Sequence, residues 1–325
     1  MIGAPDINAL IREEQGQEVI QGAIAASRAM QLCRRQPMSK RQKSMPVLNT
    51  LPEAYWVNGQ KNDQIDPATA AGQDLGRKQL TKMAWGNKIL TVEELAVIVP
   101  IHENDLADSD FNVWGQVMPR LVEAAGDRID QAVFFGTPGA DSPAGFDTGL
   151  VPAAIAAGNT FQAGSVGGQR FDVDISKAME AIELDGYMVN AAASAVNVKS
   201  RLRNLRDANG RPIYLSDVRG DGRTDSIYGE PLEFVENGSW DPAQALMLLG
   251  DFSNAVIGVR QDVTFKLFTE GVVQEPGTGL ILYNLMQDDM VALRMTFRMA
   301  FCHVNPITRF NAGNATRFPF AALTP

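Results

Sequence analysis

The most constraining feature of this sequence is the stretch from Asp110 to Gly136, in which apolar residues recur at helical spacing. Residues three and four positions apart share one face of an α-helix, so the pattern predicts a long helix with a broad apolar stripe. The stripe consists of Val113, Trp114, Val117, Met118, Leu121, Val122, Ala125, Ile129 and Val133. The polar positions between them, Asp130 included, are expected to face mostly solvent. At 1.5 Å per residue, about 25 residues would form a rod of roughly 37 Å, about twice the usual helix length.

The ends of this helix and one irregularity inside it are also marked in the sequence. Asp110 can accept hydrogen bonds from the free N–H groups of the first turn, and Gly136 is a typical stop residue. Pro119 predicts a bend, because a proline inside a helix removes one backbone hydrogen bond.

A second long element is predicted near the C-terminal end, from Met290 to Val304, where apolar and polar residues alternate. The apolar face consists of Val291, Leu293, Met295, Phe297, Met299 and Phe301. The other face carries Arg294 and Arg298, and such alternation is typical of a β-strand. At about 3.3 Å per residue this strand could extend for about 50 Å, enough to cover the helix. We therefore expect the two apolar faces to pack together, with both arginines pointing away.

Length and composition limit the class of protein. A chain of 325 residues exceeds what one hydrophobic core usually serves, so two lobes are expected. The net charge of −9 argues against a dedicated nucleic-acid binder. The longest uncharged stretch, Thr148–Gln169, contains a proline and several glycines, so it is expected to be a loop rather than a membrane span. The two cysteines, Cys33 and Cys302, suggest no disulfide framework and a reducing compartment.

Positive charge is concentrated near the N-terminus. Residues 1–50 contain seven Lys and Arg against four Asp and Glu, although the whole chain is acidic. Six of these cations fall in a segment without acidic residues: Arg28, Arg34, Arg35, Lys40, Arg41 and Lys43. The segment is either a solvated arm or a surface that docks on phosphate or on a neighbour's acidic side chains. We expect residues 1–50 to form an extended N-terminal arm, broken by Pro37 and Pro46.

Residues 51–100 are expected to form a long hairpin that stands away from the body. Strand-like segments at 55–57 and 95–101 flank a polar run, 60–76, whose apolar residues are principally Ile65 and Leu75. So long a polar excursion is unusual in a compact domain, and contact with another subunit would explain it. The candidate contact residues are Gln60, Lys61, Asp63, Ile65, Leu75 and Arg77.

The middle of the chain, residues 137–285, predicts a mixed α/β lobe. An amphipathic helix over 174–190 is followed by a small apolar strand over 191–198 and a basic helix over 199–207. Short strands separated by turns follow. Because the long helix and the long strand lie on either side of this range, the chain is expected to leave one lobe, build the second and return.

Several short motifs, in their order and spacing, resemble the major capsid proteins of tailed bacteriophages, which have the Hong Kong 97-type fold. The motifs are Ile129-Asp130-Gln131-Ala132-Val133-Phe134-Phe135-Gly136, Pro143-Ala144-Gly145-Phe146, Asn209-Gly210-Arg211-Pro212, Gly250-Asp251-Phe252-Ser253 and Asn305-Pro306. The resemblance extends from about Leu51 to Phe310. It implies an α+β fold with an N-terminal arm (1–50), an extended loop (51–100), a peripheral domain (101–136 and 286–325) and an axial domain at capsomer centres (137–285).

The resemblance also implies a function. A protein of this family is a structural, non-enzymatic subunit that assembles into pentamers and hexamers of an icosahedral phage head around double-stranded DNA. It is expected in the virion, after assembly in the cytoplasm of the host bacterium, without cofactor or membrane. Portal, decoration proteins and a separate scaffolding protein are the expected partners, the last because only about fifty residues precede the loop. The arm cations, from Arg28 to Lys43, are candidates for a lumenal surface that faces the DNA, and the surface that the arm faces stays open at this stage.

Two alternatives remain open at this stage. The first is an encapsulin-type nanocompartment shell of the same fold, which would enclose cargo protein. The second is an α/β enzyme, although His102-Glu103 lacks a second histidine four residues on and no phosphate-binding glycine motif is present. Some relatives form Lys–Asn isopeptide cross-links, for which the lysines of the hairpin region are candidates: Lys61, Lys78, Lys82 and Lys88.

Overall fold

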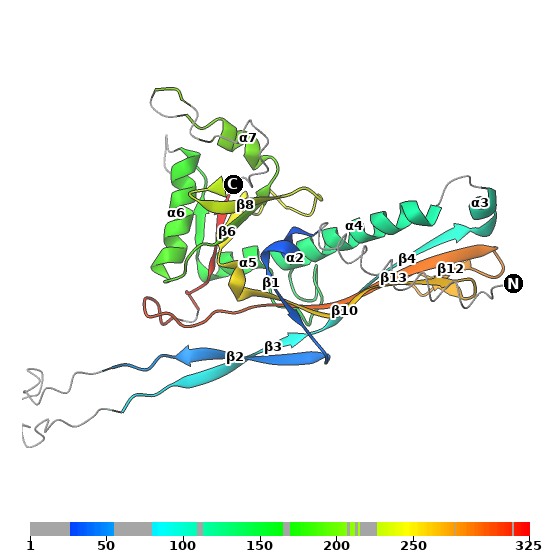
Figure 1. Cartoon of the computed structure of the whole chain (residues 1–325), viewed down its shortest axis with the longest axis horizontal. Coiled ribbons are helices and arrows are strands. Elements are labelled where there is room, and N and C mark those ends of the chain that lie inside the picture. Colours follow the sequence, from blue (N-terminus) through cyan, green and yellow to red (C-terminus); the bar gives the residue numbers. More distant parts are fainter. Residues whose placement is uncertain are drawn as a thin grey trace, which may run out of the picture.

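Two β-sheets and one long helix form the body of the protein in the computed structural model, and a separate hairpin extends away from them (Figure 1). The structure describes residues 27–54, 80–108, 113–164, 170–206, 209–211, 214, 226–275, 277–313 and 315–325. Within these ranges no helix is both long enough and apolar enough to cross a membrane.

The first sheet has four strands in the order β1-β10-β13-β4. They are β1 (Arg34–Pro37), β10 (Ala255–Phe268), β13 (Met290–His303) and β4 (Glu93–His102). The predicted long strand is β13, which pairs antiparallel with β10 on one side and with β4 on the other. It is therefore the centre of the sheet, and β1 adds a short parallel strand to the outer edge of β10.

Helix α4 (Val113–Phe134) contains Pro119 and lies along this sheet (Figure 1). Leu121, Ala125 and Ile129 share one core with Leu293, Met295, Phe297, Met299 and Phe301, which confirms the predicted stacking of the two stripes. The first turns of α4 are less covered, since Val113, Trp114 and Val117 are only half-buried. The helix end at Phe134 agrees with the predicted stop, whereas Asp110 lies outside the described residues.

The two arginines of β13 point away from α4, as predicted. Arg294 places its guanidinium carbon 4.7 Å from the ring centroid of Phe268 on β10. Arg298 Nε lies 3.5 Å from Glu94 Oε2 on β4. The arginines are thus held by neighbouring strands on the face opposite the helix.

The second sheet has six strands in the order β5-β14-β9-β6-β8-β7. They are β5 (Thr160–Gln162), β14 (Phe320–Thr324), β9 (Met247–Gly250), β6 (Ala191–Ala195), β8 (Glu230–Val235) and β7 (Ser226–Ile227). All residues of β6 and β9 are buried, as their uninterrupted small and apolar sequences predict. Helices α6 (Phe171–Leu184) and α7 (Val198–Arg203) match the two helices predicted in this lobe.

The prediction of a loop over Thr148–Gln169 is wrong, because residues 150–157 form helix α5 (Leu150–Ala157) and β5 follows it. Pro152 sits in the first turn, where the backbone N–H groups have no partner within the helix, so the proline costs little there. Gly158 ends the helix with φ of 84°, a left-handed conformation that favours glycine. The same residues that suggested a loop therefore mark the two ends of a helix.

Strand pairing crosses the domain boundaries expected from sequence. β10 lies within 137–285 but pairs with β13, and β14 lies within 286–325 but joins the six-stranded sheet. The division into an axial domain (137–285) and a peripheral domain (101–136 and 286–325) therefore stays a prediction, and the two sheets do not follow it strand for strand.

The extending hairpin consists of β2 (Gln42–Thr50) and β3 (Ala84–Thr91), which pair antiparallel. Its first strand thus begins inside the range expected for the arm, and the segment 55–57 lies outside the described residues. The prediction that 95–101 is the second strand of the hairpin is wrong, because these residues belong to β4, which pairs with β13 in the four-stranded sheet. Pro46 is tolerated in β2 because each strand of a two-stranded sheet has a free edge. The remaining elements are α2 (Arg28–Leu32), α3 (Glu103–Asp108), the 3₁₀ turn η2 (Phe252–Asn254), β11 (Val272–Gln274) and β12 (Ile281–Asn284).

The stacking of β13 on α4 can be tested by truncating one buried side chain. Phe297 is 3% exposed, so Phe297→Ala should lower the free energy of unfolding by about 3–5 kcal/mol. Arg298→Gln on the opposite face is the control, expected to cost about 0–1 kcal/mol because its ion pair is partly exposed. Urea unfolding measures both, and equal costs would contradict this arrangement.

Candidate functional site

The N-terminal arm is attached to the body through the carboxylate of Asp130 on α4. Its Oδ1 accepts hydrogen bonds from Ser27 Oγ at 2.6 Å and from the Ala29 N–H at 2.9 Å. Its Oδ2 accepts from the Arg28 N–H at 3.0 Å and from Asn237 Nδ2 at 2.6 Å. The carboxylate thus binds the first turn of α2, whose end carries unpaired N–H groups and partial positive charge.

Asp130 corrects one expectation from the sequence. It was expected among the mostly solvent-facing positions of the helix, but it is fully buried. Burial raises the pKa of the Asp130 carboxyl, while its four hydrogen bonds act in the opposite direction by favouring the ionised form. Sequence periodicity missed this role because all four donors lie more than one hundred positions away in the chain.

Beyond this attachment, residues 29–38 of the arm pack on the body rather than lying free in solvent. Ala29, Met30 and Cys33 belong to the main core, and β1 pairs with β10. Met38 donates its N–H to Val259 O at 2.8 Å and is itself buried. Gly258 allows this close approach, because a Cβ there would force the Met38 side chain to shift.

The six predicted cations of the arm differ in how much of their charge is exposed to solvent. Arg28 is half-buried and lies 3.4 Å from Glu233 Oε2, so its charge is already paired within the subunit. Lys43 is half-buried on β2, with Nζ 3.5 Å from Pro37 O. The four that are exposed are Arg34, Arg35, Lys40 and Arg41. Four of the six candidates therefore present charge to solvent.

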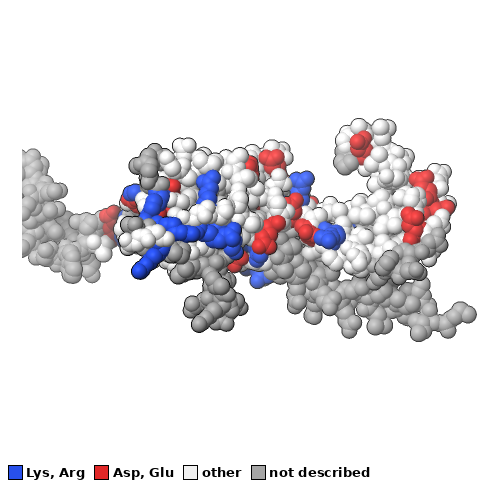
Figure 2. Space-filling model, turned by 90° about the horizontal axis from the view of Figure 1, so that it is seen from above, with Lys and Arg blue, Asp and Glu red and all other residues white. Residues whose placement is uncertain are grey.

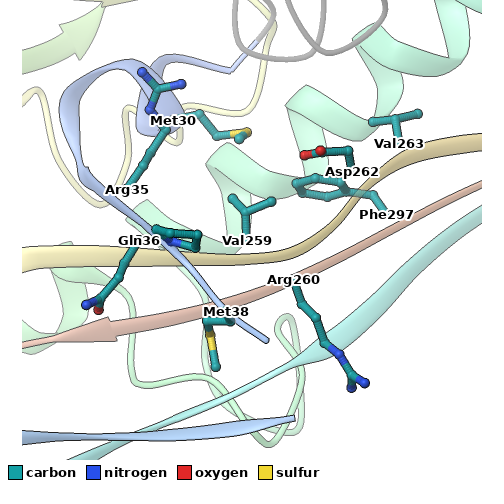
Figure 3. Close-up of a pocket in the computed structure, with 10 residues that line it drawn as sticks. Met30, Arg35, Gln36, Met38, Val259, Arg260, Asp262, Val263 and Phe297 are labelled. Atoms are coloured by element: carbon teal, nitrogen blue, oxygen red, sulfur yellow. The ribbon is translucent and has the colours of Figure 1, made fainter. Parts of the chain in front are cut away.

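A cavity of about 390 Å³ lies where the arm crosses β10 (Figure 3). Apolar side chains form most of its wall, among them Met30, Val259, Val263 and Phe297. In Figure 3, Arg35 extends toward α2, whereas Arg260 extends to the opposite side. The lining has one carboxylate, Asp262, and no cysteine, serine or histidine, so it offers no nucleophile with a neighbouring base.

The base of the hairpin is fixed by a small polar cluster beside a second cavity of about 450 Å³. Lys88 Nζ on β3 lies 2.8 Å from Asp147 Oδ2, and the same oxygen accepts the His303 N–H at 3.1 Å. The His303 ring stacks edge-to-face on Phe318, with centroids 5.0 Å apart. Lys88, one of the lysines considered for cross-linking, is therefore engaged in an ion pair in this subunit.

Large apolar side chains are exposed on both hairpins. In the unit formed by β11, β12 and the residues beside them they are Val272, Leu280, Ile281, Leu282, Tyr283 and Met286, of which Met286 is 75% exposed, and Leu267 is exposed on the adjoining end of β10. On and beside β3 they are Leu80, Met83, Trp85 and Ile89. Contiguous exposed apolar surface marks protein–protein contacts. Sequence reasoning missed the first group, although three large apolar residues in a row, 280–282, were a visible signal.

The residues predicted for contact in the extended loop lie outside the described residues: Gln60, Lys61, Asp63, Ile65, Leu75 and Arg77. Within the part of the chain that the structure covers, no group of three or more His, Cys, Asp or Glu is arranged to hold a metal ion. The features that the structure does offer are surfaces: a docked basic arm, a fixed hairpin and two exposed apolar patches.

The Asp130 attachment should be essential for holding α2. Asp130→Ala removes the acceptor of the Arg28 and Ala29 N–H groups and of the Ser27 hydroxyl, so it should cost about 2–4 kcal/mol. Amide hydrogen exchange should show faster exchange at Ala29 and Met30. Glu123→Ala on the exposed face of α4 is the control. Unchanged exchange at both amides would show that Asp130 does not hold α2 in place.

His303 should make stability depend on pH. Burial lowers the pKa of His303 to about 4. The unfolded chain protonates this histidine near pH 6.5, so stability is full above that pH and falls by about 3 kcal/mol as pH decreases toward 4. His303→Gln should remove this part of the slope in urea unfolding at several pH values. A slope that persists unchanged in the variant would assign it to other groups.

Comparison with known proteins agrees with this architecture. The sequence profile described as "Phage capsid family" matches residues 8–307. The major capsid protein of Staphylococcus phage 80alpha is 25% identical over 287 residues, which cover 87% of this chain and 78% of that protein.

Solved structures give the same result for the fold. A structure from Microbacterium phage Oxtober96 is 42% identical, with a TM-score of 0.75 over 92% of this chain and 91% of that chain. A structure from Mycobacterium phage Adephagia is 28% identical, with a TM-score of 0.74 over 100% of this chain and 98% of that chain. The fold is therefore the predicted Hong Kong 97-type fold. This chain belongs to the phage capsid family.

Proposed function

We propose that this chain is the major capsid protein of a phage head and assembles into the pentamers and hexamers of an icosahedral shell. The observation that carries the proposal is the exposed apolar surface of β11–β12, which no other part of the described subunit covers. Val273 of this hairpin packs on Leu285 and Met290, so the unit is anchored to the body on one side only. Its other side chains gain burial when a second copy covers them.

The second self-contact that we propose is the extended hairpin. β2 and β3 pair with each other and carry exposed apolar residues such as Trp85. The Lys88–Asp147 ion pair anchors the base of this hairpin to the body. We assign the continuation, from Gln60 to Arg77, to contact with a neighbouring subunit. A weak contact repeated around every capsomer becomes collectively strong.

The shell is proposed to enclose double-stranded DNA, with the exposed arm cations facing the lumen: Arg34, Arg35, Lys40 and Arg41. A surface of this kind binds the phosphate backbone without reading sequence. Scaffolding, portal and decoration proteins are the further partners, and assembly takes place in the host cytoplasm. The role is structural and not catalytic.

An encapsulin-type shell is not favoured, because relatives at 25–42% identity come from phages. The discriminating measurement is the content of purified particles, since packaged DNA supports the proposal and a protein cargo contradicts it.

The assembly surface can be tested by removing apolar character without adding charge. In the variant Leu280→Gln/Met286→Gln, both side chains are more than half exposed, so unfolding free energy should change by less than about 1 kcal/mol. Electron microscopy should show few or no closed shells. The matched control is Leu184→Gln, an equally exposed leucine on α6. Normal shells from the double variant would show that this hairpin is not an assembly contact.

A further inference from the structure

A second cationic surface, separate from the arm, is formed by α7 and the turn that follows it. Arg201, Arg203 and Arg206 are exposed, and residues 196–206 contain no acidic side chain, whereas Asp207, which follows them, lies outside the described residues. Figure 2 shows Lys and Arg side chains gathered over the end of the molecule that contains α6 and α7, and Asp and Glu side chains at the opposite end. This charge stands out in a chain whose net charge is −9.

The three guanidinium groups lack carboxylate partners within the part of the chain that the structure describes. Arg203 Nε donates to Lys199 O at 3.4 Å, and Arg206 Nη1 donates to Arg203 O at 2.6 Å. Arg201 lies over the Phe171 ring at 5.9 Å. These contacts orient the side chains and leave most of the five N–H donors of each guanidinium unused.

Three other exposed cations of the same subunit are paired with a carboxylate close to them in the sequence. Arg120 pairs with Glu123, Lys177 pairs with Glu180, and Arg170 pairs with Asp172. The α7 arginines differ from these three paired cations and resemble the exposed cations of the arm, which also have no carboxylate partner within the described residues.

The rest of the exposed surface of α7 and its two ends is mostly polar, with Asn197, Ser200 and Asn204 beside the arginines and Val196 as an exposed apolar residue. The centre of a protein–protein contact is usually apolar and poor in charge, so this surface fits a protein partner poorly. Contacts to a nucleic-acid backbone instead use Arg together with Ser and Asn side chains. Two parallel N–H groups of a guanidinium can also donate hydrogen bonds to two oxygens of one phosphate.

We propose that Arg201, Arg203 and Arg206 form a binding site for the phosphate backbone of double-stranded DNA. The proposal rests on the shell function above and adds a contact on α7 to that of the arm. Binding there is independent of base sequence, because arginines on a short surface helix meet the outer phosphates without a groove-reading element.

The test is binding of a short fluorescent DNA duplex to the purified full chain at several salt concentrations. For Arg201→Gln/Arg203→Gln/Arg206→Gln, the slope of log affinity against log salt should fall by about 2–3, since each lost phosphate contact contributes roughly 0.9. The matched control, Arg120→Gln/Arg128→Gln/Arg309→Gln, removes the same charge from exposed positions outside α6 and α7 and should change the slope by clearly less. The triple Arg→Lys variant should retain most of the slope, because the positive charge remains.

Three results would overturn the proposal. One is a wild-type chain that does not bind DNA at low salt, and another is an Arg→Gln variant with the wild-type slope. The third is a polyglutamate competitor that displaces DNA as well as free duplex does, which would assign the surface to an acidic protein partner. Electron microscopy keeps the shell function separate, because the Arg→Gln variant should still form closed shells.

Discussion

The structure depends on the burial of one long strand against one long helix. β13 and α4 each have a single apolar face, and neither face can remain in water without a large free-energy cost. Packing them together also fixes the sheet, because β10 and β4 pair along the two edges of β13. The helix and the central strand thus form the packed core to which the other parts of the subunit are attached.

The attachments use polar groups whose partners are distant in sequence. Asp130 joins the arm, α4 and the turn at Asn237 through one buried carboxylate. Lys88, Asp147 and the His303 backbone join the extending hairpin to the end of β13. Buried charges and donors are stable only when paired, so each cluster holds its elements in one relative position. Segments that reach outward can therefore keep a defined direction.

A folded body whose hairpins carry exposed apolar side chains is suited to assembly with other subunits. The described part of the subunit does not cover the apolar residues of β11–β12 and β3, and we propose that neighbouring subunits do so. The exposed cations of the arm and α7 have no carboxylate partner within that part, and we propose that an external anion binds them. The described subunit has a packed core but leaves large apolar side chains exposed on its surface. Its function lies in contacts that a single copy does not make.

The sequence by itself determined the elements whose pattern is local. Helical spacing predicted α4 and alternation predicted β13, including its inward and outward faces, while the motifs indicated the family. Only the tertiary structure decided that Asp130 is buried, that residues 42–50 pair with β3, and that β10 and β14 join their particular sheets. The physical reason is that periodicity records which face of an element is apolar. Strand partners and hydrogen-bond donors are instead chosen by residues far along the chain, which meet only when the fold brings them together.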